Sequence, residues 1–168
     1  MANRETIFSQ LGSALTKIAR ILSGNVELAR YLKYMDEEPL SDTFPDPQKT
    51  DIYDHNIRYR PLIRLDELHE AFCIIAWTYG SVGYNMDFGT AMLSVDIFCP
   101  IDAWMMNDVC QRPFRIMDIL MRELNNKRIT GIGQLKFEAF ELKILTDEYS
   151  QHKMTFSIDA NNSNELTN

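Results

Sequence analysis

The chain has 168 residues, of which 45% are hydrophobic and 24% charged, a balance typical of one globular domain with a core of ordinary size. No run approaches the ~20 consecutive apolar residues of a membrane helix, and the N-terminus lacks the apolar stretch of a secretory signal, so we expect a protein folded in a cytoplasm. A net charge of −7 without a cluster of Lys and Arg argues against a protein that grips a phosphate backbone.

The first expected elements are helices within residues 4–34. Apolar residues recur there at three- and four-residue spacing and form one stripe: Ile7, Leu11, Ala14, Leu15, Ile18, Ile21 and Leu22. We expect Gly24 to end the first helix and Asn25 to cap a second, short one. The stripe faces either the core, which is the commoner arrangement, or a partner.

An irregular acidic loop is expected over residues 36–56, where prolines and short polar residues replace any periodic pattern. Connections of this length are uncommon in compact domains and are either disordered or functional. Its acidic residues lack the spacing of a calcium loop, so we expect no metal there. Phe44, Ile52 and Tyr53 are apolar side chains on a polar arm, which indicates docking onto this domain or onto a neighbour.

The central part of the chain predicts strands. Residues 57–62 suit an edge strand, because Pro61 cannot donate to a ladder. Residues 72–77 are apolar on both faces, as in a buried central strand or a short buried helix, and Gly80 and Gly83 are expected to end them. Residues 90–99 alternate cleanly, with one apolar side formed by Ala91, Leu93, Val95, Ile97 and Cys99.

A helix is expected from Trp104 to Leu124, capped by Asp102 and broken or kinked at Pro113. A glycine turn at 130–133 then leads into strands 135–145 and 152–158, and a change of phase near Ala139 predicts a β-bulge. The prediction is a single α/β (α+β) domain over residues 1–159. It consists of an antiparallel or mixed sheet packed against an N-terminal helix and a central helix, with the long acidic loop and a polar tail at 160–168.

No residue pattern predicts catalysis, a cofactor or a metal centre, so we expect no enzymatic activity. The three cysteines, Cys73, Cys99 and Cys110, form no CxxC pair and are expected to be reduced and buried, and the three histidines share no ligand spacing. The 131–133 glycine pair precedes a strand, whereas a phosphate loop precedes a helix. The segment Trp104, Met105 and Met106 suits either the core or a subunit interface.

The layout over residues 57–159 resembles the small α/β tail terminator and tail-completion (head–tail joining) proteins of long-tailed bacteriophages. The segments that carry the resemblance are 95–98, 112–117, 130–137, 149–150 and 154–156.

The resemblance implies a structural virion protein. Copies of the chain would form a ring, commonly a hexamer, at the head-proximal end of the tail, having assembled in the bacterial cytoplasm. The ring would stop polymerisation of the tail tube protein and dock the head–tail connector or neck, while genomic DNA passes through the lumen without being held. Its contacts need exposed edges and apolar anchors. The candidates are Phe44, Tyr53, Arg58, Arg60, Trp104, Met105 and Met106. Alternatives are a stopper or adaptor elsewhere in the connector, or a small host-interacting binding domain.

Overall fold

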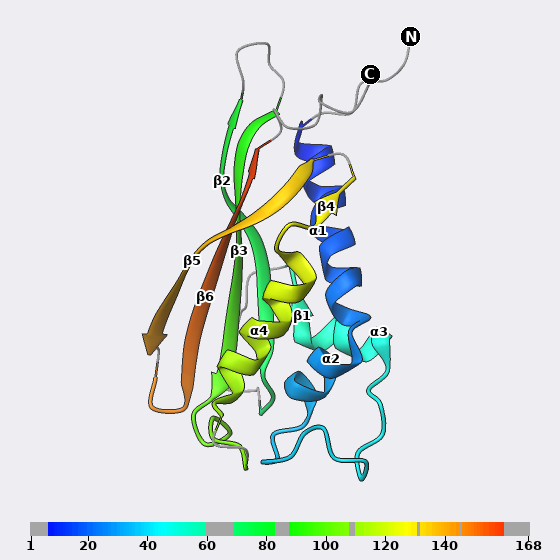
Figure 1. Cartoon of the computed structure of the whole chain (residues 1–168), viewed down its shortest axis with the longest axis vertical. Coiled ribbons are helices and arrows are strands. Elements are labelled where there is room, and N and C mark those ends of the chain that lie inside the picture. Colours follow the sequence, from blue (N-terminus) through cyan, green and yellow to red (C-terminus); the bar gives the residue numbers. More distant parts are fainter. Residues whose placement is uncertain are drawn as a thin grey trace.

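The computed structural model describes residues 7–59, 69–82, 88–107, 110–130, 132–144 and 146–159. A six-stranded mixed sheet curls into a half-barrel, and the helices lie together on one of its faces (Figure 1). The predicted α+β class is therefore confirmed. Residues 1–6, Arg60 and the polar tail lie outside the described part of the chain.

The N-terminal helices follow the sequence pattern closely. α1 spans Ile7–Ser23 and buries Ala14, Ile18 and Leu22, so the apolar stripe faces the core as the commoner arrangement requires. α2 spans Val26–Lys33, and its N-cap is Asn25, whose side chain accepts a hydrogen bond from the Leu28 backbone N–H at 2.8 Å. Both predicted boundaries are confirmed.

The prediction of an irregular loop over residues 36–56 was wrong at the C-terminal end of that range. Helix α3, Lys49–Asp51, continues into one π-helical turn, η1, Ile52–Asn56. Ile52 is fully buried, and the Asn56 amide donates to the backbone carbonyls of Leu32 and Ala71. A lone apolar residue has no periodicity to detect, so the pattern did not reveal this turn.

The sheet has the strand order β1-β2-β3-β6-β5-β4. The strands are β1 Ile57–Arg58, β2 Phe72–Val82, β3 Phe88–Pro100, β4 Arg128–Ile129, β5 Gly133–Ile144 and β6 Tyr149–Asp159. β1 pairs parallel with β2 at the edge, and the other pairs are antiparallel. Residues 72–77 are thus a strand, and 57–58 form the expected edge.

The long hairpin of β2 and β3 corrects one prediction and confirms another. β2 continues past Gly80, because it pairs with β3 up to Val82, and it ends directly before Gly83, the second of the two glycines expected to end it. The five residues predicted to share the apolar side of β3 are all fully buried in the core. On the opposite face of the sheet, Phe72, Phe98 and Tyr149 form a second, smaller apolar cluster.

The central helix is shorter than predicted. α4 spans Arg112–Leu124, and residues 101–107 form turns, so neither a helix from Trp104 nor an Asp102 cap exists. Pro113 lies in the first turn of α4, where its missing N–H breaks no intrahelical bond. A proline inside a continuous helix costs about 3 kcal/mol, so starting the helix here avoids that penalty.

The predicted bulge in β5 is confirmed. The register with β6 shifts between Phe137 and Ala139. Because of the extra residue, Phe137 opposite Phe156 and Phe140 opposite Met154 both point toward the helix-covered face. The apolar side of β5 therefore stays on one face along the whole strand.

Candidate functional site

The acidic loop docks onto its own domain. The Phe44 ring stacks on Tyr34 with centroids 4.5 Å apart. The Arg30 guanidinium donates to the backbone carbonyls of Leu40, Ser41 and Phe44 and pairs with Asp46 at 2.9 Å. The loop was expected to dock either onto this domain or onto a neighbour, and the structure shows it docked onto helix α2 of this domain.

Tyr53 and Arg58 also make contacts within the chain. The Tyr53 hydroxyl lies 3.3 Å from that of Tyr59, and this hydrogen bond raises the pKa of Tyr53. The Arg58 Nε donates to the His55 carbonyl at 2.6 Å, and its guanidinium carbon lies 5.3 Å from the centre of the Phe72 ring.

The segment 104–106 is divided between core and surface. The Trp104 Nε1 donates to the Ser150 hydroxyl at 2.8 Å, and Met106 is buried. Met105 points outward with 55% of its surface exposed. Trp104 and Met106 thus follow the core interpretation, and Met105 is the member of the segment that is exposed for a partner.

Arg112 is a central residue that the sequence pattern did not single out. It is fully buried, and it donates to the backbone carbonyls of Ala103 at 2.8 Å, Tyr31 at 3.1 Å, Tyr34 at 2.6 Å and Asp36. The guanidinium therefore satisfies carbonyls at the C-terminus of α2, where a cation is also favoured by the helix dipole. Burial lowers the pKa of Arg112. Arg112 lies four residues before the buried Ile116 and so shares its helix face, and this spacing was the signal in the sequence that Arg112 faces the core.

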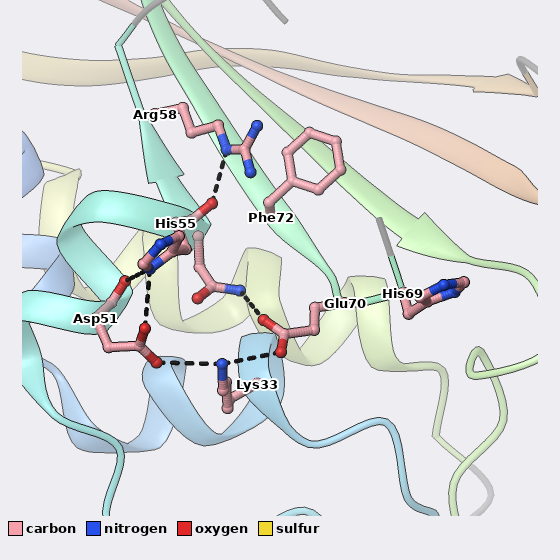
Figure 2. A pocket seen from close by; sticks show the side chains of 8 residues that line it. Lys33, Asp51, His55, Arg58, His69, Glu70 and Phe72 are labelled. Carbon is pink, nitrogen blue, oxygen red and sulfur yellow. Dashed lines mark hydrogen bonds and ion pairs between the residues drawn. The ribbon is translucent and has the colours of Figure 1, made fainter. Parts of the chain in front are cut away.

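A polar pocket of about 310 Å³ lies where α2, η1 and the start of β2 meet (Figure 2). The Lys33 ammonium sits between Asp51 at 3.1 Å and Glu70 at 2.9 Å. Asp51 also contacts His55 Nδ1 at 2.8 Å, and the Asn56 amide donates to Glu70 at 3.1 Å. The described lining residues are Lys33, Asp51, His55, Asn56, Arg58, His69, Glu70 and Phe72.

The electrostatics of this pocket favour a structural role. The hydrogen bond to Glu70 raises the pKa of Lys33, and the hydrogen bond from Lys33 lowers the pKa of Asp51. Both shifts move the groups away from neutral pH, whereas a general acid or base needs a pKa near the working pH. The cluster therefore joins three elements by paired charges.

An apolar groove of about 440 Å³ runs between α4 and β5. Phe114, Met117 and Met121 of α4 form one wall, and Phe137, Phe140 and Met154 form the strand side. Phe114 is 46% exposed and Phe140 57% exposed. Beside the groove, the buried His152 ring lies 5.8 Å from the Phe114 ring and 5.5 Å from the Trp104 ring. Neither of its nitrogens has a hydrogen-bond partner among the described residues, and burial lowers the pKa of His152.

The YomW family model matches residues 25–158, which include the sheet, α4 and both pockets. The chain belongs to the YomW family. The family description names no activity, substrate or partner. No curated protein matches the chain.

In this YomW-family chain, the described residues contain no group of three or more His, Cys, Asp or Glu side chains arranged to hold a metal ion. Burial raises the pKa of Cys73 strongly and that of Cys99 to about 12, so both thiols stay protonated at neutral pH. Cys110 is only partly buried, unlike the prediction for all three cysteines. None of the helices in the described ranges has the length and apolar character needed to span a membrane.

Proposed function

We propose that the chain is a structural virion protein that forms a ring at the head-proximal end of a phage tail, ends tail-tube assembly and joins the tail to the head or neck. The layout of its β3-α4-β5-β6 unit supports the proposal, because that order is the one on which the resemblance rests. The YomW family membership neither adds to this assignment nor opposes it.

The observation that carries the proposal is the apolar groove between α4 and β5, with its exposed aromatic rim. Large apolar patches on a soluble protein mark contact surfaces. Here the exposed side chains are Phe114 and Phe140 at the groove and Leu142 on the same strand. A surface of this composition offers contact area for another protein, as a subunit of a ring requires.

The experiment combines the purified protein with tubes assembled from the tail tube protein and images them by negative-stain microscopy. We expect ring-shaped density at one tube end and tubes that stop growing. Phe140→Glu should abolish capping, because it places a charge on the groove rim. Val26→Glu is the matched control. Val26 is also an exposed apolar residue, and a carboxylate suits the first turn of α2.

Localisation in intact particles separates the alternatives. Density for the chain within the connector would make it a stopper or adaptor. Absence from purified virions, together with binding to one host protein, would favour the host-interacting alternative. Tubes that bind no protein and grow without limit would contradict the terminator assignment.

A further inference from the structure

The free end of β5 is uncovered on both faces and along its outer edge. β4 pairs only with Gly133 and Gln134. The neighbouring turn adds bonds from the Leu135 N–H to the Lys127 carbonyl, from the Asn126 N–H to the Leu135 carbonyl and from the Phe137 N–H to the Asn125 side chain. Beyond these, no described residue pairs with the outer edge of β5. The side chains of residues 138–143 are all exposed.

The diagonal course of α4 explains why this segment is uncovered. The N-terminal turn of α4 lies over β6, where Phe114 contacts His152, and Asn125 at the C-terminal end of α4 accepts a hydrogen bond from the Phe137 N–H of β5. Figure 1 shows β5 continuing past the helices to the outer side of the sheet. Phe140 lines the open groove beside α4, and both Phe140 and Leu142 face the helix side yet stay about half exposed. An open edge beside apolar side chains is a template for pairing with another strand.

We propose that two copies of the chain close this edge in solution by antiparallel β5–β5 pairing about a two-fold axis at Leu142. The occupant of the open edge is thus the same segment of a second copy. The pair is isologous, so both edges are used and no third copy can be added to them.

The register follows from symmetry. A two-fold axis perpendicular to the sheet leaves each face of the sheet on its own side. Residues opposite each other must therefore have side chains on the same face. This condition is met only when the axis lies midway between the two copies of one residue. An axis at Glu141 or at Lys143 places like charges directly opposite each other, which is destabilising. An axis at Phe140 requires the bulged Glu138 to join the ladder opposite Leu142.

An axis at Leu142 is the complementary choice. It places Glu141 opposite the partner's Lys143 and Lys143 opposite the partner's Glu141. Within one protomer these two side chains share a face, 3.5 Å apart and about half exposed. The pair therefore joins four charges of alternating sign, and opposite-charge cross-strand pairs are stabilising.

The other face of the pair is apolar. Leu142 lies opposite its own counterpart, and the two α4–β5 grooves open toward each other on the same side of the joined sheet. Phe140 and Leu142, which are 57% and 48% exposed in one protomer, become covered.

This inference does not depend on the proposed phage function, because it concerns the isolated protein. If a ring uses the same edge, the pair has to open before a protomer enters the ring.

Charge exchange tests the register. Sedimentation analysis should find wild-type dimers, and Glu141→Lys or Lys143→Glu should each raise the dimer dissociation constant about tenfold or more. The double variant E141K/K143E should restore it to within about threefold of wild type, because the opposite charges meet again. Lys136→Glu is the matched control, since it makes the same charge change on the same strand, outside the open segment. It should leave the dimer unchanged.

A cross-link tests the axis independently of charge. Facing residues in antiparallel strands have Cα atoms about 4.5–5.5 Å apart, which is within the range of a disulfide. Leu142→Cys should give a covalent dimer under mild oxidation, whereas Lys136→Cys and the wild type should show only the background from the native thiols. A wild-type monomer at about 100 µM, a double variant as weak as the single ones, or no cross-link above background would each overturn the proposal.

Discussion

Replacing Arg112 with methionine tests whether one buried guanidinium joins α2 to the start of α4. Methionine keeps much of the side-chain volume, so the change removes hydrogen bonds more than it creates a cavity. Four backbone carbonyls lose their donor in this variant. They come from the end of α2, from the start of the acidic loop and from the turns before α4.

The magnitude depends on how many of these carbonyls water can reach. The bonds to Ala103 and Tyr31 are fully buried, and those to Tyr34 and Asp36 are partly buried. A buried polar group without its partner costs about 1–3 kcal/mol, so the two fully buried carbonyls lose about 4 kcal/mol of stability. Partial hydration makes the cost at the other two carbonyls smaller, and relief from burying the guanidinium charge offsets part of the loss. For a domain of this size, 4 kcal/mol lowers the Tm by about 8–16 °C.

Differential scanning fluorimetry and urea unfolding of Arg112→Met measure this loss. The matched control is Arg122→Met on the same helix, where an exposed guanidinium pairs only with Glu27 among the described contacts. An exposed pair contributes at most about 1 kcal/mol, so the control should change the Tm by a few degrees or less. Hydrogen exchange should also rise in residues 31–37 of Arg112→Met. Equal Tm values for the two variants would refute the argument that these carbonyls depend on Arg112.

Three further predictions concern single contacts. Because burial lowers the pKa of His152, the unfolded chain binds a proton first as the pH falls. Urea midpoints of the wild type should therefore decrease below about pH 6.5. His152→Met should remove that decrease without loss of stability at pH 7.5. A parallel decrease of the midpoint in the wild type and the variant would contradict the assignment to His152. Asn25→Ala removes the α2 cap and should cost about 1 kcal/mol, or about 2–4 °C in Tm, and an unchanged Tm would show that the cap adds nothing. Lys33 lowers the pKa of Asp51, so this carboxylate stabilises the fold above its unfolded pKa of 3.8 and the effect is lost as the pH falls through the lower folded value. Asp51→Asn should cost less than about 1 kcal/mol at pH 7, because the group is partly exposed, and the difference from wild type should shrink toward pH 3 rather than grow.

The parts of the fold that were predicted correctly are those set by local pattern. The alternation of β3, the Asn25 cap and the phase change in β5 each depend on a few neighbouring residues. In each case one local conformation has the lowest energy, so the neighbouring residues were sufficient to predict it. The prediction allowed an antiparallel or a mixed sheet, and the local pattern did not distinguish between the two.

The parts that could not be predicted depend on distant residues. Pro113 suits both a kink and a helix start, and the contacts of Arg112 with carbonyls 76–81 residues earlier favour the start. Ile52 is a lone apolar residue whose buried site is created by other elements. Trp104 suited both the core, which was the favoured interpretation, and an interface, and its bond to Ser150 shows that it follows the core interpretation. Of the predicted contact residues, Met105 remains mostly exposed, and the groove aromatics Phe114 and Phe140 were missed.

The lengths of the elements explain why the contact surface lies at the end of β5. α4 has 13 residues and is about 20 Å long, whereas β5 has 12 residues and extends about 40 Å. A helix half as long as the strand beside it cannot cover the whole apolar face, and the diagonal course of α4 leaves the end with Phe140 and Leu142 uncovered. If those residues served only this chain, polar side chains would be less costly at both positions, because exposed apolar surface favours aggregation. Their apolar character is explained if a second polypeptide completes the cover that α4 is too short to provide.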